Sequence, residues 1–360
     1  MKKLWCILLL CCFAAAGFKA RRTVVPYVFP QMQNFPSMPL PGNNPVTAAG
    51  VDLGRHLFYD PILSADSTIA CASCHRQATA FADGGTAFSK GINGAVQSRN
   101  TMPLFNLAWY SSYFWDGRAV SLEEQVYQPV RAHNEMNLSW AEAVKRISRS
   151  TMYRKKFATA FGDERIDSAR IGMAIAQFER TLLSYRSKYD LVLLGLEEFT
   201  ADEYNGFMLM NDMSMADCLH CHTTDADVLG TTGDYSNNGL DTITDAATYK
   251  DKGLGGANGR REDIGKFRVP SLRNIALTAP YMHDGRFKTL EEVLDFYSEG
   301  VNHSVNIDSK MGFVRQQGVR LKPKEKQDII AFLHTLTDSA FIKDPALGNP
   351  FGTGMLVGHK

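Results

Sequence analysis

One short pattern, present twice, constrains this chain more than any other feature. The motif Cys-x-x-Cys-His occurs as CASCH, from Cys71 to His75, and again as CLHCH, from Cys218 to His222. With 7 cysteines and 9 histidines in 360 residues, only about 0.003 matches are expected by chance. The repeated pattern therefore needs a chemical cause, and it predicts two sites of the same kind.

The spacing is typical of covalent attachment of a c-type haem. Two thiols at this separation can bond to the two vinyl groups of the porphyrin, and the following imidazole reaches the iron. Zinc ribbons place their Cys pairs about 15–20 residues apart, whereas 143 residues separate Cys74 from Cys218. A disulfide or a thioredoxin-like redox pair leaves the histidine unexplained. We predict two haems, both with a histidine on iron, held by Cys71, Cys74, His75, Cys218, Cys221 and His222.

The N-terminus predicts export. Residues 1–20 begin with two lysines and continue with an apolar run and small residues, which is typical of a secretory signal peptide and too short to span a bilayer. Lipid attachment at Cys11 or Cys12 is the alternative. No later stretch is long and apolar enough for a transmembrane helix. We therefore expect a periplasmic protein without a transmembrane span, either free or lipid-anchored.

Length and charge narrow the choice of partners. A chain of 360 residues is long enough for two ordinary domains. Its 39 basic and 38 acidic residues give a formal net charge of +1. This balance gives no reason to expect nucleic acid or an anionic membrane as a partner.

The remaining sequence predicts a mainly α-helical protein. Residues 21–48 are rich in Pro, Asn and Met and predict an extended N-terminal arm. We expect an N-terminal haem domain over residues 49–190, a C-terminal haem domain over 191–345 and a tail over 346–360. Capping boxes predict four helix starts, pairing Ser121 with Glu124, Ser139 with Glu142, Thr200 with Glu203 and Thr289 with Glu292.

Two further stretches have clear patterns. The first is an apolar stripe at helical spacing that predicts a helix closing the first domain, at Ile171, Ile175, Phe178, Leu182 and Tyr185. The second runs from His222 to Phe267 and is rich in Gly, Asp, Thr and Asn. A loop of this length is functional or poorly ordered, and its place after an expected iron ligand favours a cover over the haem edge.

Several motifs together resemble the bacterial dihaem cytochrome c peroxidases and the related MauG proteins, over roughly residues 45–340. They are LGRHLFYD (53–60), CASCH, RNTMPLFN (99–106), FWDGRAVSLEEQ (114–125), CLHCH and FRVPSLRNIALTAPYMHDG (267–285). The resemblance implies two cytochrome-c-like helical domains with one haem in each. The N-terminal haem would meet peroxide, and the C-terminal haem would pass or store electrons.

The resemblance also implies residues for the first haem. Gln125 and Glu135 match the family's acid–base pair, and cleavage of peroxide needs such proton transfer. His133 is a nearby rival, more typical of an exposed residue. Trp115 matches an electron relay between the haems. At the position of the distal histidine found in closed peroxidases this chain has Gly91, which favours a first haem open at rest, as in MauG proteins.

For the second haem, the sixth ligand is the main question. Tyr297 occupies the position where MauG proteins have Tyr and peroxidases have Met, and Met282 and Met311 remain alternatives. A phenolate ligand favours higher oxidation states of iron, whereas Met raises the potential. His283 resembles a residue near a haem propionate, and His220 is expected to be exposed.

The family also has a calcium ion between the haems. Asn100 and the backbone carbonyls of Thr278 and Pro280 match its ligands, and such oxygen ligands suit calcium. One calcium ion is therefore expected beside the two haems.

Three functions follow from these observations. The first is an exported peroxidase that reduces hydrogen peroxide with electrons from a small cytochrome c or cupredoxin. The second is MauG-like oxidation of a side chain on a partner protein. The third is a dihaem electron-transfer cytochrome without enzymatic activity. A homodimer is compatible with the resemblance, although no motif establishes it.

Overall fold

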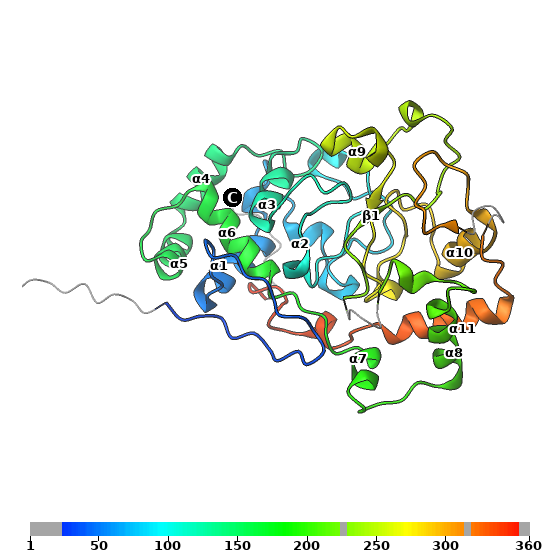
Figure 1. The fold of residues 1–360 in the computed structure, drawn as a ribbon. Helices are drawn as coiled ribbons and strands as arrows, with labels where there is room; N and C mark the ends of the chain where they lie inside the picture. Colours follow the sequence, from blue (N-terminus) through cyan, green and yellow to red (C-terminus); the bar gives the residue numbers. More distant parts are fainter. Residues whose placement is uncertain (1–23, 224–228, 313–317, 353–360) are drawn as a thin grey trace, which may run out of the picture.

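Helices supply most of the regular structure, as the sequence predicts. The computed structural model describes residues 24–223, 229–312 and 318–352. Two short strands, β1 (Tyr235–Ser236) and β2 (Phe267–Arg268), pair antiparallel. The helices are α1 (Ala48–Tyr59), α2 (Cys71–Cys74), α3 (Leu122–Arg131), α4 (Trp140–Arg149), α5 (Thr151–Phe161), α6 (Ser168–Glu179), α7 (Lys188–Leu193), α8 (Ala201–Asn211), α9 (Gly253–Asn258), α10 (Leu290–Asp295) and α11 (Pro323–Thr335). The mainly α-helical class is thus confirmed (Figure 1).

All four predicted helix starts are confirmed. The hydroxyl groups of Ser121, Ser139, Thr200 and Thr289 each accept a hydrogen bond from the backbone N–H three residues on, at the start of α3, α4, α8 and α10. These bonds satisfy backbone donors that have no partner within a helix.

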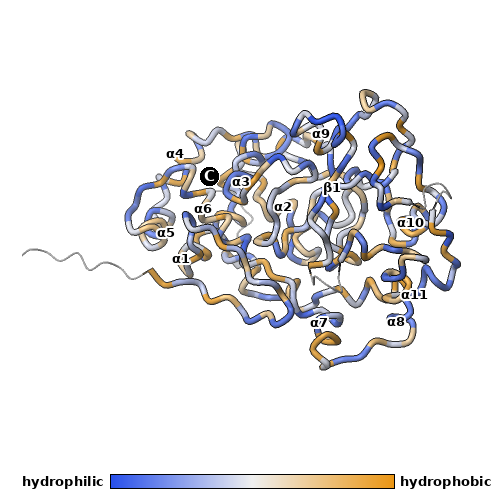
Figure 2. Tube along the Cα trace, in the orientation of Figure 1, coloured by the Kyte–Doolittle hydropathy of each residue, from blue (hydrophilic) through white to orange (hydrophobic). Residues whose placement is uncertain are grey.

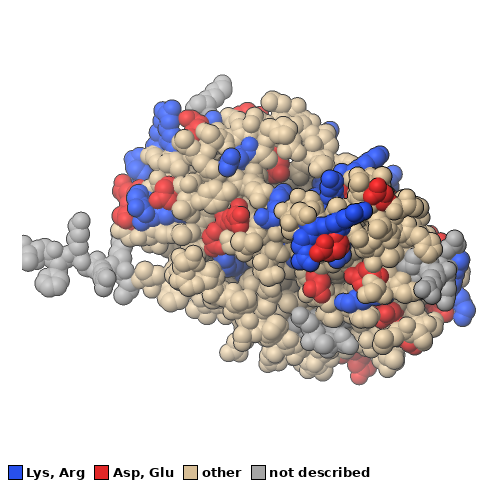
Figure 3. Space-filling model, turned by 45° about the horizontal axis from the view of Figure 1, so that its top comes forward, with Lys and Arg blue, Asp and Glu red and all other residues tan. Residues whose placement is uncertain are grey.

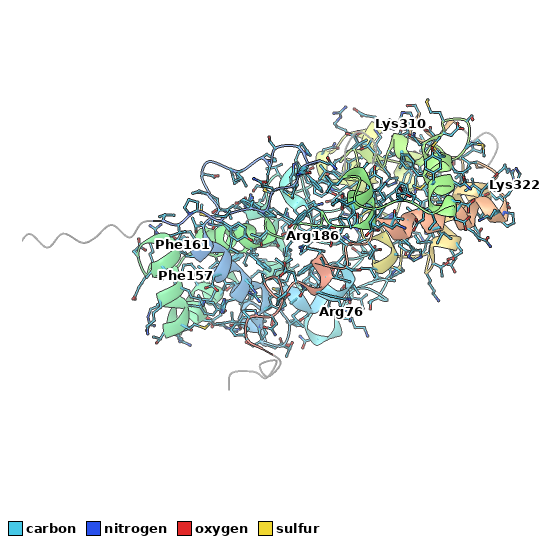
Figure 4. All side chains as sticks on the ribbon, turned by 90° about the horizontal axis from the view of Figure 1, so that it is seen from below. Arg76, Phe157, Phe161, Arg186, Lys310 and Lys322 are labelled. Carbon is cyan, nitrogen blue, oxygen red and sulfur yellow. The ribbon has the colours of Figure 1, made fainter. Side chains whose placement is uncertain are left out.

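Buried apolar side chains form two main clusters. Figure 2 shows apolar residues as orange stretches distributed along the chain. The first cluster contains buried residues between Leu53 and Leu182, largely from α1 and α3 to α6. The second lies between Tyr189 and Leu336 and packs α8 against α11. Phe341 and Leu347 then return to the first cluster. In Figure 4, Phe157 and Phe161 of α5 lie at the end of the molecule opposite Lys310 and Lys322.

The predicted helix over residues 171–185 is too long. Helix α6 ends at Glu179, so Leu182 and Tyr185 lie beyond it, although Leu182 is fully buried. The apolar spacing correctly predicted that Leu182 is buried, but the chain stays buried beyond the end of the helix.

Outside the helices, the described part of the arm, residues 24–47, contains no helix. It lies against the first half, because the Trp109 indole N–H donates to the Pro36 carbonyl at 3.2 Å. The predicted signal peptide and residues 353–360 of the predicted tail lie outside the described residues. No helix among the described residues has the length and apolar character needed to cross a bilayer. Lys, Arg, Asp and Glu are interspersed on the face shown in Figure 3.

Candidate functional site: two cavities at the repeated motif

Each copy of the repeated motif folds into one tight turn. In CASCH, α2 ends where the His75 N–H donates to the Cys71 carbonyl at 2.9 Å. In CLHCH, the His222 N–H donates to the Cys218 carbonyl at 3.0 Å. None of the four cysteines in the motifs forms a disulfide. Each turn therefore presents two thiols and an imidazole to the same cavity.

The two histidine rings are oriented in the same way. The Nδ1 atom of His75 lies 2.8 Å from the Phe81 carbonyl, and that of His222 lies 2.8 Å from the Pro270 carbonyl. Because a carbonyl only accepts, each Nδ1 carries the hydrogen, which leaves Nε2 free to bind a metal. Burial lowers the pKa of both rings, for His222 to about 4. Both imidazoles are therefore neutral at pH 7, as iron ligands must be.

The first cavity has a volume of about 800 Å³ and is lined by Cys71, Cys74 and His75. That volume lies in the range of about 300–1,000 Å³ typical of ligand pockets. Gln125 and Glu135 line the same cavity, so the structure brings the predicted acid–base pair to the predicted haem site. The donor atoms and the space both fit a haem.

The segment that carries Glu135 folds back on α3, the helix that carries Gln125. After α3 ends, the Met136 N–H donates to the Pro129 carbonyl at 3.1 Å, and the Leu138 N–H donates to the Val130 carbonyl at 2.7 Å. Burial raises the pKa of the Glu135 carboxyl, and the positive charge of Arg118 lowers it. The rival His133 is exposed and does not line the cavity.

Gly91 lines this cavity directly beside Glu135. The Ile92 N–H donates to the Glu135 carbonyl at 2.9 Å. A Cβ atom at Gly91 would lie 2.2 Å from the Asn134 carbonyl oxygen and 2.7 Å from the Glu135 Cα. In this arrangement the position has no room for a side chain, and so none for a distal histidine.

Trp115 lies between the two cavities and lines both. It is 9% exposed, and its indole N–H donates to the Asn100 carbonyl at 2.8 Å. Arg268 and Pro270 also line both cavities. Since the Pro270 carbonyl accepts from His222, the wall shared by the cavities also orients the second histidine.

The second cavity is smaller, about 220 Å³, and is lined by Cys218, Cys221 and His222. This volume is below the range of about 300–1,000 Å³ usual for ligand pockets. The donor atoms fit a haem, but the space is tighter than at the first motif. His220, at the edge of this cavity, is 41% exposed at its side chain, as predicted.

All three candidate sixth ligands line the second cavity: Tyr297, Met282 and Met311. Tyr297 belongs to a π-helical turn, Phe296–Gly300, that directly follows α10, and such turns are frequent at functional sites. The Asn238 amide donates to the Tyr297 hydroxyl at 3.0 Å and to the Met282 sulfur at 3.7 Å. Burial raises the pKa of Tyr297 to about 12.

The expected calcium ligands also lie together on the second cavity. Asn100, Thr278 and Pro280 all line it. The Asn100 side-chain amide donates to the carbonyls of Thr86 and Ala87 at 3.2 and 3.1 Å, which leaves its Oδ1 as an acceptor. In the described part of the chain no three His, Cys, Asp or Glu side chains form a metal cluster, so any ion here would depend on amide and carbonyl oxygens.

His283 lines the second cavity and stacks on Phe267, with ring centroids 3.6 Å apart. Its carbonyl accepts from the Asn100 N–H at 2.7 Å. Burial lowers the pKa of the His283 ring. His283 thus links the second cavity to the segment that carries the expected calcium ligand.

The long stretch after His222 reaches both cavities. Asn238 lines the second cavity, and Lys250 and Asp251 line the first. Asp251 accepts two hydrogen bonds from the Arg99 guanidinium, each at 2.7 Å. The stretch thus lines the cavity of its own motif and also that of the other motif, and its role as a cover over a haem edge stays a prediction.

Sequence reasoning missed Arg118, Glu179 and Asn238. The first two line the first cavity, and Asn238 lines the second. FWDGR marks Arg118 as part of a motif, whereas nothing in the local sequence distinguishes Asn238 or predicts the burial of Glu179.

Comparisons with known proteins identify the family to which the chain belongs. A family model described as di-haem cytochrome c peroxidase matches residues 48–198. Methylamine utilization protein MauG of Methylophilus methylotrophus is 34% identical over 84% of this chain and 87% of its own length. Cytochrome c551 peroxidase of Nitrosomonas europaea is 34% identical over 87% of this chain and 88% of its own.

A crystal structure of a MauG-like protein associated with microbial copper homeostasis also matches. It has a TM-score of 0.82 and 35% sequence identity, over 90% of this chain and 99% of that one. These matches identify the chain as a helical dihaem oxidoreductase. Within this class, the chain belongs to the family of bacterial dihaem cytochrome c peroxidases and MauG proteins.

Proposed function

We propose that this protein is an exported dihaem c-type peroxidase that reduces hydrogen peroxide to water with electrons from a small redox protein. The observation that carries the proposal is the first cavity, where Glu135 and Gln125 line the same space as His75 and its two thiols. Membership of an oxidoreductase family also argues against a carrier without enzymatic activity.

Haem attachment would use the four cysteines of the two motifs, with His75 and His222 on iron through Nε2. A haem bound in the first cavity supplies an iron at which peroxide can be cleaved. The protein's own contribution is proton transfer. Glu135, ionised, would take a proton at its carboxylate from one peroxide oxygen and return it to the other oxygen, which leaves. The Gln125 amide orients the peroxide beside it.

Two features keep this carboxyl suited to its task. Burial raises its pKa, so the carboxylate is a stronger base than an exposed one, while Arg118 limits that rise. Gly91 adds no side chain to this wall, and the backbone of Asn134 and Glu135 packs directly against it.

Electrons would cross between the two sites through Trp115, which lines both cavities. Tyr297 is our proposed sixth ligand in the second cavity. Asn100 and the carbonyls of Thr278 and Pro280 would hold one calcium ion, and His283 would lie near a haem propionate.

The decisive experiment replaces Glu135 by Gln in the holoprotein. Glu135→Gln keeps the shape but cannot take up the proton, so peroxide turnover should fall by about 10²- to 10⁴-fold. His133→Gln, two residues away and exposed, is the matched control and should retain full turnover. Unchanged turnover in Glu135→Gln would refute the proposed role of this carboxyl.

A MauG-like oxidation of a partner's side chain is the second candidate. It is favoured by Gly91, whose position has no room for a distal side chain, and by Tyr297 on the second cavity. It predicts a long-lived oxidised state of the protein after peroxide is added without an electron donor. Rapid return to the resting spectrum under those conditions would favour the peroxidase.

The cellular setting is also a proposal. Residues 1–20 would direct export to the periplasm, either with removal of the signal or with lipid attachment at Cys11 or Cys12. The electron donor would be a small cytochrome c or a cupredoxin, and the protein would act as a monomer or a homodimer.

A further inference from the structure

Glu179, the last residue of α6, is a buried carboxyl that the proposed function does not use. It is 4% exposed, and it lines the first cavity together with Ile175, one helical turn earlier. Its Oε2 atom is buried without a hydrogen-bond partner among the residues that the structure describes. A carboxylate in this position would lack the hydrogen bonds that buried charges normally require.

The neighbouring charges do not compensate for this burial. The positive charge of Arg180 favours ionisation of Glu179, but the Arg180 guanidinium donates to both oxygens of Glu123, at 2.8 and 3.0 Å. The negative charge of Glu123 in turn disfavours ionisation of Glu179. Burial has the largest effect and raises the pKa of Glu179 to about 8.

Helices α1, α3 and α4 pack against α6. Apart from Glu123, their charged groups have other partners or are exposed: Asp52, Arg55 and His56 on α1, Glu124 and Arg131 on α3, and Glu142, Lys145, Arg146 and Arg149 on α4. The titratable groups that face Glu179 from outside α6 also include Cys71 and Tyr113, on which its charge acts. Both of these residues line the first cavity as well.

We propose that Glu179 is a proton-binding group in the wall of the first cavity, and that its protonation is coupled to the oxidation state of a haem attached there at Cys71. The inference rests on the proposal that a haem occupies this cavity. It does not depend on peroxide being the substrate.

The coupling follows from charge balance at a buried site. Reduction adds one electron to the haem iron from an external donor. The added negative charge favours uptake of one proton from solvent by the Glu179 carboxylate, so the net charge of the cavity is unchanged. Oxidation releases the same proton. The reduction potential of this haem should therefore fall as pH rises through the range in which Glu179 ionises.

The first test is an optical redox titration of the first haem in the holoprotein from pH 6 to pH 10, without peroxide. In the wild type we expect a potential that falls with pH around 8, where the carboxyl titrates. Glu179→Gln should remove this dependence, because the amide cannot titrate. Glu164→Gln, on an exposed side chain, is the control and should keep it. The same pH dependence in Glu179→Gln would overturn the proposal.

A second measurement uses chemical unfolding. The folded pKa lies above the ordinary unfolded value of about 4.3, so the folded state holds a proton that the unfolded state has lost. This lowers stability as pH rises from about 4 toward 8. Glu179→Gln should therefore gain stability over the wild type at pH 7–8 and no advantage near pH 4. An equal difference at both pH values would contradict a buried neutral acid.

Infrared spectroscopy covers the case in which Glu179→Gln fails to fold or to bind haem. The wild type at pH 7 should show the C=O band of a protonated carboxyl, and Glu179→Met, of similar size, should lack it. Persistence of that band in the variant would refute the assignment. Since these measurements use no peroxide, their failure is separate from any failure of Glu135→Gln in peroxide turnover.

Discussion

Each cavity contains its own copy of the Cys-x-x-Cys-His turn, and the two cavities differ in their other lining residues. In both, two thiols and a histidine line the space, and the histidine Nδ1 lies 2.8 Å from a backbone carbonyl. The first cavity is lined by Glu135, Gln125 and Glu179, whereas the second is lined by the candidate ligands Tyr297, Met282 and Met311. If the motifs attach the haems as we propose, the other lining residues of each cavity would decide whether a substrate or a side chain can reach its iron.

The largest expected effect, apart from the loss of Glu135 itself, comes from adding a side chain to the wall of the first cavity. Gly91→Ala places a Cβ 2.2 Å from the Asn134 carbonyl oxygen, so the backbone at Asn134 and Glu135 must move. A displacement of about 1 Å can cost about 10²-fold in rate. Steady-state peroxide turnover is the measurement.

A matched glycine provides the control for this substitution. A Cβ at Gly42 would meet nothing within 4 Å, so Gly42→Ala should retain full turnover. Full turnover in Gly91→Ala would mean that the contact between Gly91 and Glu135 does not keep the first cavity open. Steric exclusion of a side chain would then not explain the difference between the two cavities.

The sequence predicted the features that depend on residues close together in the chain better than the contacts between distant residues. The helix starts depend on residues within four positions of one another, and all four were predicted correctly. CASCH and CLHCH each form a tight turn, and covalent haem attachment at these turns stays a prediction. Glu135 and Tyr297 were placed only through a resemblance to a family. The burial of Glu179 and the contact of Asn238 with Tyr297 involve residues distant in sequence, so no local pattern predicts them.

A more moderate effect is expected in the second cavity. If Tyr297 binds the second iron, Tyr297→Phe should change the optical and magnetic resonance spectra of that haem and leave those of the first unaltered. Burial raises the pKa of the Tyr297 hydroxyl to about 12. A phenolate ligand would therefore form only if the charge of the metal lowered this pKa. Loss of the Asn238 hydrogen bond should lower stability by about 1 kcal/mol.

Three further variants determine which side chain is the ligand. Met282→Leu and Met311→Leu should leave the second spectrum unchanged, and Tyr204→Phe, on an exposed side chain of α8, is the control. If the spectrum of the second haem changed in either methionine variant and not in Tyr297→Phe, that methionine would be the sixth ligand. The second haem would then have the type of ligand expected in the peroxidases.

The smallest effect concerns the pH range in which the first cavity works. Turnover that needs the Glu135 carboxylate falls as pH drops through its pKa, which burial raises and Arg118 lowers. Arg118→Gln should therefore move the acidic limb of kcat/KM to higher pH. The shift should be small because Arg118 is partly exposed. Lys145→Gln, on an exposed side chain of α4, should leave the limb in place. A shift of the acidic limb to lower pH would mean that Glu135 is not the group that titrates. The acid–base group that distinguishes the first cavity from the second would then be another residue.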